Sequence, residues 1–359
     1  MDPTTELDIG IVGLGTHGRH RARLLDNAGQ RVFGADASKD ARNQFDRKFE
    51  KHHVTDPEGL FEMELDGIII ATPNKFHAPA AIEAMERGHD VFIEKPLAHT
   101  LEAARTIQRV AESTGRLCMV GYQSRFLNVC KILKQYIDEG FFGEIRHVET
   151  AYRRRRGVPG RGSWYTAKEI AGGGALIDIG IHVFDLLLYF LEETTVTEMM
   201  ATTRCDFGSR ESYAYLDMWG EDDDANMFDV EDSVSAFLSF SEGTTATVEV
   251  AWATNAESAH QYHIHGTEAG ALLDITDVLN ASTDVHQSLT FYEARTGGAH
   301  HYLDSTVTTT PNDPYVAQME TFLEAVATGR DPSINTLEQA LAIQRLVHRI
   351  YADNGELIE

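Results

Sequence analysis

The stretch of sequence that decides the fold reads Leu7-Asp8-Ile9-Gly10-Ile11-Val12-Gly13-Leu14-Gly15-Thr16-His17-Gly18. Its apolar first half predicts a short buried strand, and its second half is a GxGxxG pattern that follows the strand without a break. Apolar residues at positions 22, 24 and 25 then predict a helix, and residues 31–35 predict a second strand that ends at Asp36. This order of strand, glycine turn, helix, strand and acidic residue is typical of the start of a doubly wound α/β domain.

Each part of this pattern suits a dinucleotide. The glycines allow a tight turn and a close approach to a pyrophosphate, and the helix that begins at Thr16 and His17 offers N-terminal amides to that anion. The Asp36 carboxylate would accept hydrogen bonds from the ribose hydroxyls and repel a 2′-phosphate, which favours NAD; nearby Lys39 leaves NADP open. The expected cofactor residues of this segment are Gly13, Gly15, Thr16, His17, Gly18 and Asp36.

The alternation of strands and helices continues to about residue 124. Further strands are expected at residues 67–71, 90–93 and 117–120, and helices at 75–87 and 101–113. Ligands of such sheets bind beyond the carboxyl ends of the strands. Those ends carry Thr72, Pro73, Asn74, Glu94, Lys95 and Tyr122. Lys95 is either a lysine at a cofactor, with a pKa lowered by burial, or a solvated lysine at a strand end.

After residue 128 the pattern changes from alternation to a run of strands. Strands are expected at 145–153, 198–204, 261–265 and 289–292, a hairpin over 233–252, and helices at 129–139, 315–328 and 337–352. Thr336 and Gln339 form a capping box before the last helix. Consecutive strands indicate an α+β domain with a mostly antiparallel sheet. We therefore expect an α/β domain over 1–124 and an α+β domain over 125–359, whose C-terminal helices could pack back on the first.

The charge is the unusual feature of the composition. Asp and Glu outnumber Lys and Arg by 56 to 31, which gives a formal net charge of −25. Because the acidic residues are spread along the chain, they indicate the surface of a halophilic protein rather than one acidic binding region, and they argue against nucleic-acid binding. We expect a cytoplasmic protein for three reasons. The N-terminus is acidic and has no signal pattern, no apolar run has the length of a membrane span, and the three cysteines have no metal-binding spacing.

A second stretch, residues 172–185, carries the candidate chemistry. Three glycines precede an apolar run in which Asp178, His182 and Asp185 share one helix face. A carboxylate beside an imidazole could hold and deprotonate a hydroxyl group. The alternatives are a buried helix start whose polar groups satisfy one another, or a metal site.

Other acidic and histidine clusters offer weaker signals. The run Glu221-Asp222-Asp223-Asp224, followed by Asp229, Glu231 and Asp232, could bind a hard cation, but a solvated loop is favoured. His263 and His265 alternate on a strand without a third ligand, and we expect a structural role for them. No metal site is therefore predicted.

Four motifs stand in order along the chain. They are GxGxxG, Ala71-Thr72-Pro73-Asn74 with His77, Glu94-Lys95-Pro96, and the glycine turn with Asp178 and His182. In these the chain resembles the glucose–fructose oxidoreductase, inositol dehydrogenase and rhizopine-catabolism (Gfo/Idh/MocA) family over nearly its whole length. The resemblance implies a Rossmann domain followed by a domain with an open-faced, mostly antiparallel sheet, which often mediates homodimers or homotetramers.

The resemblance also implies roles for individual residues. Lys95 would bridge cofactor and substrate hydroxyl, with a cis Lys95–Pro96 bond; Asp178 would bind the substrate, and His182 would be the acid/base. Asp185 is expected to have a supporting role. The remaining expected cofactor residues are Ala71, Thr72, Pro73, Asn74, His77, Glu94, Lys95 and Gln123, and the expected substrate residues are Lys95, Arg125, Arg156, Trp164, Asp178 and His182.

The function implied is a dehydrogenase that uses NAD, or NADP, to oxidise a ring hydroxyl of a sugar, inositol or sugar derivative. The chemistry is consistent with these residues, because a secondary alcohol loses hydride as its proton leaves, and histidine is a base near neutrality. An NAD-assisted glycoside hydrolase that keeps its cofactor bound is the alternative. A catalytically idle NAD sensor is disfavoured by the intact Lys95, Asp178 and His182.

Overall fold

The computed structural model describes residues 6–49, 53–192, 195–214, 228–276 and 287–357. The chain forms two compact units. The first consists of Met1–Gln123, Glu169–Gly172 and Tyr315–Arg345, and the second of Ser124–Lys168, Gly173–Pro314 and Leu346–Glu359. The chain thus passes into the second unit at Ser124, and Tyr315–Arg345, expected within the second domain, belongs to the first unit.

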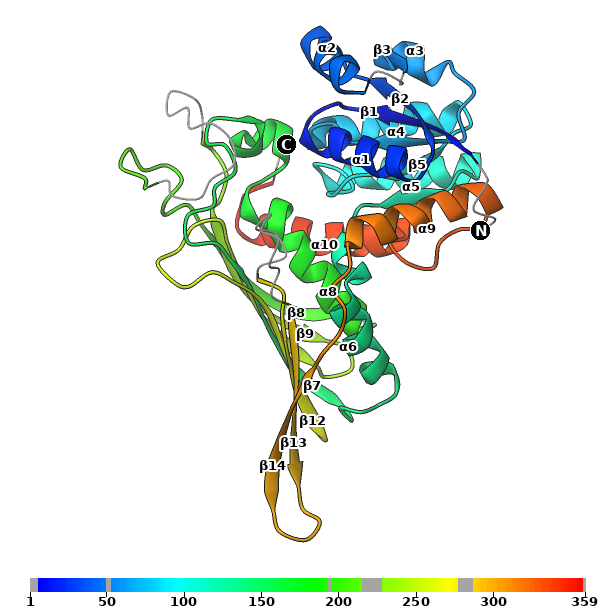
Figure 1. Cartoon of the computed structure of the whole chain (residues 1–359). Helices are drawn as coiled ribbons and strands as arrows, with labels where there is room; N and C mark the ends of the chain where they lie inside the picture. Colours follow the sequence, from blue (N-terminus) through cyan, green and yellow to red (C-terminus); the bar gives the residue numbers. More distant parts are fainter. Residues whose placement is uncertain (1–5, 50–52, 193–194, 215–227, 277–286, 358–359) are drawn as a thin grey trace. The chain divides into compact units, whose positions relative to one another are not determined.

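The first unit is built on a six-stranded parallel sheet with the order β3-β2-β1-β4-β5-β6 (Figure 1). Its strands are β1 (Asp8–Val12), β2 (Arg31–Ala35), β3 (His53–Thr55), β4 (Gly67–Ile70), β5 (Asp90–Ile93) and β6 (Cys118–Val120). Since β1 pairs with both β2 and β4, the strand order reverses at β1. In open α/β sheets the ligand crevice lies beyond the carboxyl ends of the strands at such a reversal.

Helices connect these strands. They are α1 (Thr16–Asn27), α2 (Lys39–Lys48), α3 (Pro57–Phe61), α4 (His77–Glu86) and α5 (Leu101–Thr114), with a 3₁₀ turn, η1 (Asn74–Phe76), before α4. The sequence did not predict α2, α3 or β3. The reason is composition: α2 buries only Phe45, so it lacks the apolar periodicity that reveals a surface helix.

Apolar burial on both faces holds this sheet. Ile68, Ile69 and Ile70 of β4 are all completely buried, as consecutive residues of an inner parallel strand must be. Helix α9 (Pro314–Thr328) contributes Phe322, whose ring centroid lies 5.5 Å from that of Phe92 in β5. The last helix, α10 (Leu337–Asp353), begins with the predicted capping box.

That capping box is confirmed. The Thr336 amide donates to Oε1 of Gln339 at 3.2 Å, and the Gln339 amide donates to Oγ1 of Thr336 at 3.3 Å. The reciprocal bonds satisfy two of the amides that a helix start leaves without partners.

The second unit is built on an eight-stranded sheet with the order β14-β13-β12-β11-β7-β10-β9-β8. Its strands are β7 (Ile145–Arg153), β8 (Val196–Arg204), β9 (Ser233–Phe240), β10 (Thr245–Ala251), β11 (Ala259–Gly266), β12 (Ala269–Asp274), β13 (Ser288–Arg295) and β14 (His301–Val307). Only the β7–β10 pair is parallel among the described pairs. Helices α6 (Asn128–Asp138) and α8 (Ile181–Leu191) pack on the sheet and on each other, as Figure 1 shows.

The alternation of burial along these strands matches a sheet with one covered face. In β9, Val234, Ala236 and Leu238 are buried, whereas Phe237 between them is 40% exposed. Period-two burial of this kind is what an antiparallel sheet with one packed side requires. The mostly antiparallel second sheet therefore agrees with the expectation from the run of strands.

One apolar stretch among the described residues, Lys168–Leu191, has the length and composition of a membrane span. It is 89% buried inside the structure over its most apolar window, as the core helix of a folded domain is. Within it, a π-helical turn, η4 (Leu176–Gly180), directly precedes α8. Such turns are rare and concentrate at functional sites.

Candidate active site

The three glycines of the GxGxxG turn have different surroundings. Gly13 adopts a φ of +97°, and a Cβ there would lie 2.6 Å from the backbone of Ala71. A Cβ on Gly18 would lie 1.9 Å from the carbonyl oxygen of Gly13, so only glycine lets α1 approach the turn this closely. At Gly15 the Cβ position is open, since apart from the adjoining residues no atom of the described chain lies within 4 Å of it. The residues therefore fit a dinucleotide, which needs a tight turn, close packing and an open approach for pyrophosphate.

Asp36 stands at the end of β2, beside this turn. Its Oδ2 accepts a hydrogen bond of 2.8 Å from the Leu14 amide, and its Oδ1 accepts one of 2.8 Å from the Ser38 amide. These bonds fix the carboxylate while leaving acceptor capacity for the hydroxyls of a ribose. Thr16 and His17 lie in the first turn of α1, whose N-cap, Gly15, makes no side-chain cap bond, and the positive end of the helix dipole there favours an anion.

Lys95 follows β5, and its side chain is half-buried. The Lys95–Pro96 peptide bond is cis, as the resemblance implied. Oε1 of the preceding Glu94, an expected cofactor residue, accepts a hydrogen bond of 2.6 Å from Nε of the completely buried Arg21. Burial acts to raise the pKa of Glu94, but the charges of Arg21 and His17 hold that pKa at about 2.

Arg21 is a residue that the sequence reading missed. It lies on the buried face of α1 with Gly18, Ala22 and Leu25, and its Nη2 donates a second bond of 2.8 Å to Gln318. An arginine in register with the apolar face of a helix is a signal for a buried ion pair. Arg21 thus connects the dinucleotide helix to the strand end that carries Lys95.

Asn74 and His77 are committed to backbone carbonyls of the first unit. The Asn74 side-chain amide donates to the Ala171 carbonyl at 2.7 Å, and the two ring nitrogens of His77 lie 2.7 Å and 2.8 Å from the carbonyl oxygens of Pro96 and Thr72. Both side chains are expected to line the cofactor, and these contacts hold them in place.

The other expected cofactor residues of this unit are backbone or buried positions. The Ala71 amide donates to the Val12 carbonyl at 2.8 Å, so Ala71, Thr72 and Pro73 leave β4 beside the glycine turn. Gln123 is buried, with an exposed fraction of 6%.

In the second unit the π turn and the start of α8 carry Asp178 and His182, which are 7% and 5% exposed. Nε1 of Trp252 donates a hydrogen bond of 2.9 Å to Oδ2 of Asp178. The carbonyl of His182 accepts a bond of 3.3 Å from the Tyr262 hydroxyl. Trp252 and Tyr262 thereby fix the carboxylate and the helix start that carries the imidazole.

A buried aromatic cluster continues from Tyr262. Nε2 of His260 lies 3.2 Å from the Tyr262 hydroxyl, and the His260 ring stacks on Tyr152 with centroids 4.1 Å apart. Arg154 donates a bond of 3.0 Å to the Tyr152 hydroxyl. Burial and the charge of Arg154 lower the pKa of His260 to about 3, so this histidine is neutral.

Sequence reasoning missed Trp252, His260, Tyr262 and Tyr152. The last three occupy covered-face positions of β11 and β7. Polar aromatic residues at inward strand positions were the available signal, since their polar atoms need buried partners.

Arg125, an expected substrate contact, forms a buried ion pair. It is 2% exposed, and its Nε donates a bond of 2.8 Å to the completely buried Asp185. Burial raises the pKa of Asp185 to about 6, although Arg125 acts against that rise. The pair joins the segment before α6 to α8, and Asp185 supports the helix rather than the substrate.

Arg156 and Trp164 remain expected substrate contacts. Arg156 donates to the Thr254 carbonyl at 2.7 Å and to Oδ1 of Asn255 at 2.6 Å. Trp164 is half-buried and stacks on Tyr165 with ring centroids 3.8 Å apart. Both side chains are ordered by neighbours within the second unit.

Glu231 holds the glycine turn that leads into the π turn. Its carboxylate accepts bonds of 2.9 Å from the amides of Gly174 and Leu176, and one of 3.0 Å from the Tyr351 hydroxyl. Burial raises the pKa of Glu231 to about 7. Asp232 accepts bonds from the amides of residues 207 and 208 at 2.6 Å and 2.8 Å.

These acidic residues are therefore bound to the backbone. The structure shows no group of three or more potential metal ligands among the residues it describes, and the acidic run 221–224 lies outside those residues.

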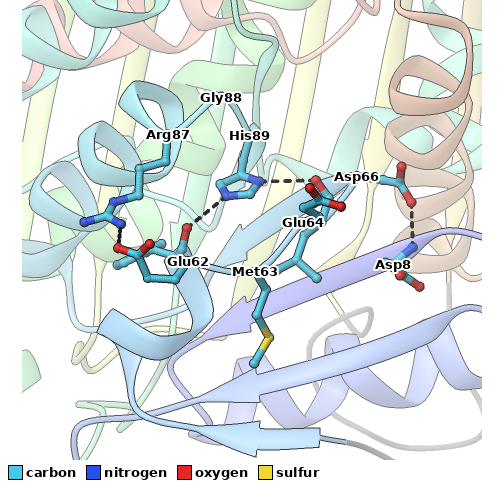
Figure 2. A pocket seen from close by; sticks show the side chains of 10 residues that line it. Asp8, Glu62, Met63, Glu64, Asp66, Arg87, Gly88 and His89 are labelled. Atoms are coloured by element: carbon cyan, nitrogen blue, oxygen red, sulfur yellow. Dashed lines mark hydrogen bonds and ion pairs between the residues drawn. The ribbon is translucent and has the colours of Figure 1, made fainter.

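A separate pocket of 710 Å³ opens at the amino ends of β1, β4 and β5 (Figure 2). It is lined by Asp8, Phe61, Glu62, Met63, Glu64, Leu65, Asp66, Arg87, Gly88 and His89. The glycine turn and Lys95 stand at the carboxyl ends of the same strands. The pocket therefore lies at the opposite end of the strands from the glycine turn and Lys95.

Comparison with known proteins agrees with both units. Residues 7–122 match the family model described as "Oxidoreductase family, NAD-binding Rossmann fold", and residues 131–272 match "GFO/IDH/MocA C-terminal domain". D-glucoside 3-dehydrogenase of Escherichia coli (strain K12) is 30% identical, over 85% of this chain and 82% of its own. The chain belongs to the GFO/IDH/MocA family. It is an NAD(P)-dependent oxidoreductase, and the expectations for fold, enzyme class and cofactor are confirmed.

Other GFO/IDH/MocA proteins match over greater lengths at lower identity. The scyllo-inositol 2-dehydrogenase (NAD(+)) of Bacillus subtilis (strain 168) is 25% identical over 93% of this chain and 90% of its own. A solved structure of levoglucosan dehydrogenase in complex with NADH superposes with a TM-score of 0.80 at 21% identity, covering 98% of both chains. At that identity the superposition shows the shared fold.

Proposed function

We propose that this protein transfers hydride between a nicotinamide cofactor and a ring hydroxyl of a sugar, inositol or sugar derivative. The observation that carries the proposal is the glycine turn, in which Gly13 and Gly18 are too crowded for a side chain while Gly15 is open. The printed names of similar proteins support the substrate class, since they act on a glucoside, on scyllo-inositol and on levoglucosan.

Three residues have the proposed catalytic roles. His182 takes the hydroxyl proton at its imidazole, Asp178 binds the hydroxyl group, and Lys95 stabilises the developing negative oxygen with its ammonium group. The nicotinamide, when bound, supplies the hydride acceptor. Support comes from the ordering of these groups: the Trp252 indole fixes Asp178, and Tyr262 fixes the main chain at His182.

Aromatic and arginine side chains support a sugar-like substrate. Trp164 is half-buried and already stacked on Tyr165, and an exposed aromatic face can pack against the C–H groups of a sugar ring. Arg156 presents a guanidinium that is held by two neighbouring acceptors. We propose both as substrate contacts, and NAD as the preferred cofactor; the place of Asp36 directly after β2, where the ribose-binding acid of such folds is expected, supports this.

A screen of sugars, inositols and glycosides with NAD and NADP tests the proposal. We expect nicotinamide reduction with at least one cyclic polyol, lost in His182→Ala while NAD affinity is retained. His263→Ala, a histidine on β11 of the same unit, serves as the matched control. If His182→Ala turns over like the wild type, the acid/base role is wrong. Glycoside cleavage without net NADH, by protein that retains bound cofactor, would favour the NAD-assisted hydrolase.

We also propose that the protein is cytoplasmic, halophilic and a homodimer or homotetramer. Support for the oligomeric state comes from exposed apolar side chains on the strands of the second unit, where Met200 is 75% exposed and Tyr302 is 87% exposed. Support for the halophilic character is the net charge of −25. Sedimentation in molar salt tests the oligomeric state, and a monomer at all concentrations would contradict it.

A further inference from the structure

His77 is the first residue of α4, and its ring is buried, with an exposed fraction of 1%. Nδ1 lies 2.7 Å from the Pro96 carbonyl oxygen, and Nε2 lies 2.8 Å from the Thr72 carbonyl oxygen. Both distances are those of strong hydrogen bonds. The ring therefore uses both nitrogens on the protein's own backbone.

The two carbonyls belong to different strand ends. Thr72 follows β4 and Pro96 follows β5, and these strands are neighbours in the parallel sheet. Lys95 is bonded directly to Pro96. The His77 ring thus joins the segment that contacts the glycine turn to the segment that carries the lysine ammonium group.

Carbonyl oxygens only accept, so a neutral ring donates to one of them at a time, and donating to both needs a proton on each nitrogen. The pKa of His77 is lowered, mainly by burial and also by the charge of Lys95, against the opposing effects of the two carbonyls and the charge of Glu94. These charged neighbours both lie on the segment after β5.

We propose that His77 is a positioning residue, which holds the segment Glu94-Lys95-Pro96 against the end of β4 and thereby places Lys95 for the reaction. The inference rests on the proposed catalytic role of Lys95. Both ring nitrogens lie against carbonyls of the first unit, so the proposed effect of His77 on the reaction acts through the lysine segment.

The physical reason is that a catalytic ammonium group must be held within a fraction of an ångström. Without His77 the carbonyls of half-buried Thr72 and buried Pro96 lose this partner, and the lysine segment can shift to find new ones. A displacement of about 1 Å can lower the rate of a positioned reaction by about 100-fold. Cofactor affinity depends mainly on the glycine turn and α1, so it should change little.

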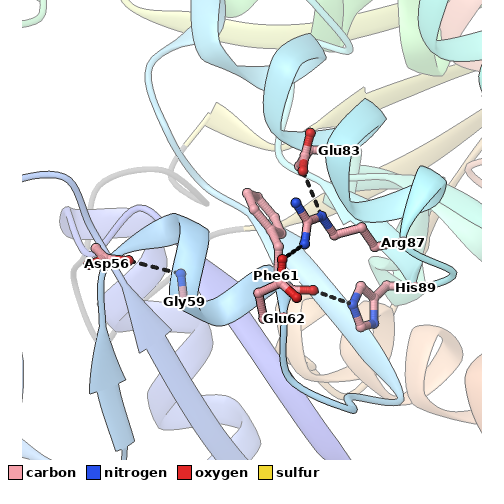
Figure 3. A network of polar contacts seen from close by, with 7 residues as sticks. All are labelled: Asp56, Gly59, Phe61, Glu62, Glu83, Arg87 and His89. Atoms are coloured by element: carbon pink, nitrogen blue, oxygen red, sulfur yellow. Dashed lines mark hydrogen bonds and ion pairs between the residues drawn. The ribbon is translucent and has the colours of Figure 1, made fainter.

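The chain contains a matched control. His89, 5% exposed, directly precedes β5, and its ring nitrogens lie 3.2 Å from the Leu65 carbonyl and 3.3 Å from the Phe61 carbonyl. Figure 3 shows this ring beside the Arg87, Glu62 and Glu83 network. His89 therefore makes the same kind of two-carbonyl bridge at the amino ends of the strands of the same sheet, away from Lys95.

The test compares His77→Gln and His77→Asn with His89→Gln. We expect all three to lower the denaturant midpoint, but only the His77 variants to lower kcat, by about 10- to 100-fold, with the NAD dissociation constant within about threefold of wild type. Equal kcat in the His77 and His89 variants at matched stability would overturn the proposal. So would a loss confined to NAD affinity.

A second readout does not depend on activity. The rate at which pyridoxal 5′-phosphate and borohydride label Lys95, followed by peptide mass spectrometry, reports the environment of its amine. We expect a several-fold change in the His77 variants and none in His89→Gln. If the wild type oxidises no sugar, the proposed function fails while this difference still supports positioning. An unchanged labelling rate in the His77 variants of an active enzyme overturns the positioning role alone.

Discussion

The indole Nε1 of Trp252 donates a hydrogen bond of 2.9 Å to Oδ2 of Asp178, across 74 residues of sequence. Trp252 is completely buried at the end of β10, and Asp178 lies in the π turn before α8. A carboxylate that is fixed in this way can bind a substrate hydroxyl without first losing its own side-chain freedom.

Trp252→Phe should therefore impair catalysis more than folding. A hydrogen bond to a charged group contributes about 1.5–3 kcal/mol, so kcat/KM should fall by about 10- to 100-fold. Steady-state kinetics check this. In an Asp178→Asn background the same substitution should add little, and an undiminished kcat/KM in the single variant would show that the bond has no catalytic effect.

Arg21→Met should strongly destabilise the first unit. The substitution leaves Glu94 buried without its counter-charge, a change that typically costs about 3–5 kcal/mol of unfolding free energy. Denaturant unfolding measures the loss. Arg23→Met, at an exposed position of the same helix, is the control, and adding Glu94→Gln to Arg21→Met should recover part of the stability.

The ion pair of Arg21 and Glu94 also predicts that the unfolding free energy falls at acidic pH. The pKa of Glu94 is about 2 in the folded protein, below its value of 4.5 as a free side chain. Its stabilising contribution is therefore present above pH 4.5 and is lost as pH falls toward 2. In Arg21→Met this part of the acid sensitivity should be absent.

Glu231 should make stability depend on pH in the opposite sense. Burial raises its pKa from 4.5 to about 7, so the folded state holds a proton that the unfolded state releases between these values. Its contribution is greatest below pH 4.5 and falls by about 3 kcal/mol as pH rises through 7. Unfolding free energies from pH 5 to 8 should slope less in Glu231→Gln. Parallel slopes in that variant and in the control Glu249→Gln, an exposed carboxylate of β10, would contradict this.

Asp36→Ala should relax the choice of cofactor. The carboxylate repels a 2′-phosphate at short range, where a pair of like charges costs on the order of 1 kcal/mol or more near a surface. The ratio of kcat/KM for NAD to that for NADP should therefore fall by about tenfold. Asp40→Ala, an acidic residue in the first turn of α2, controls for net charge. The ribose assignment fails if Asp36→Ala keeps the wild-type ratio.

Salt should stabilise the protein. With a formal net charge of −25, repulsion among surface carboxylates opposes folding at low ionic strength, and it is screened when the Debye length falls to about 3 Å at 1 M salt. Thermal unfolding should shift upward between low and molar KCl. A flat or falling midpoint would remove the argument for a halophilic surface.

Local patterns were sufficient for the framework of the fold. Residues 31–35 and 90–93 were expected as strands and are β2 and β5, and the capping box at Thr336 and Gln339 formed as expected. Such features depend on neighbours a few residues away, so periodicity and composition reveal them. The polar helix α2 was not predicted from the sequence, because it buries a single apolar side chain.

The sequence by itself determined the dinucleotide turn. Gly13 marks where the backbone must turn, Gly15 where the turn must stay open, and Gly18 where the helix must pack closely. By contrast, the sequence did not determine which groups pair with the residues around the candidate site. Arg21 reaches Glu94 across 73 residues, Arg125 reaches Asp185 across 60, and the ring nitrogens of His77 lie against carbonyls that are 19 and 5 residues away. Only the tertiary structure could decide these pairs. Once a polar atom is buried it must find a partner in its surroundings, and which atoms surround it is set by how the whole chain folds.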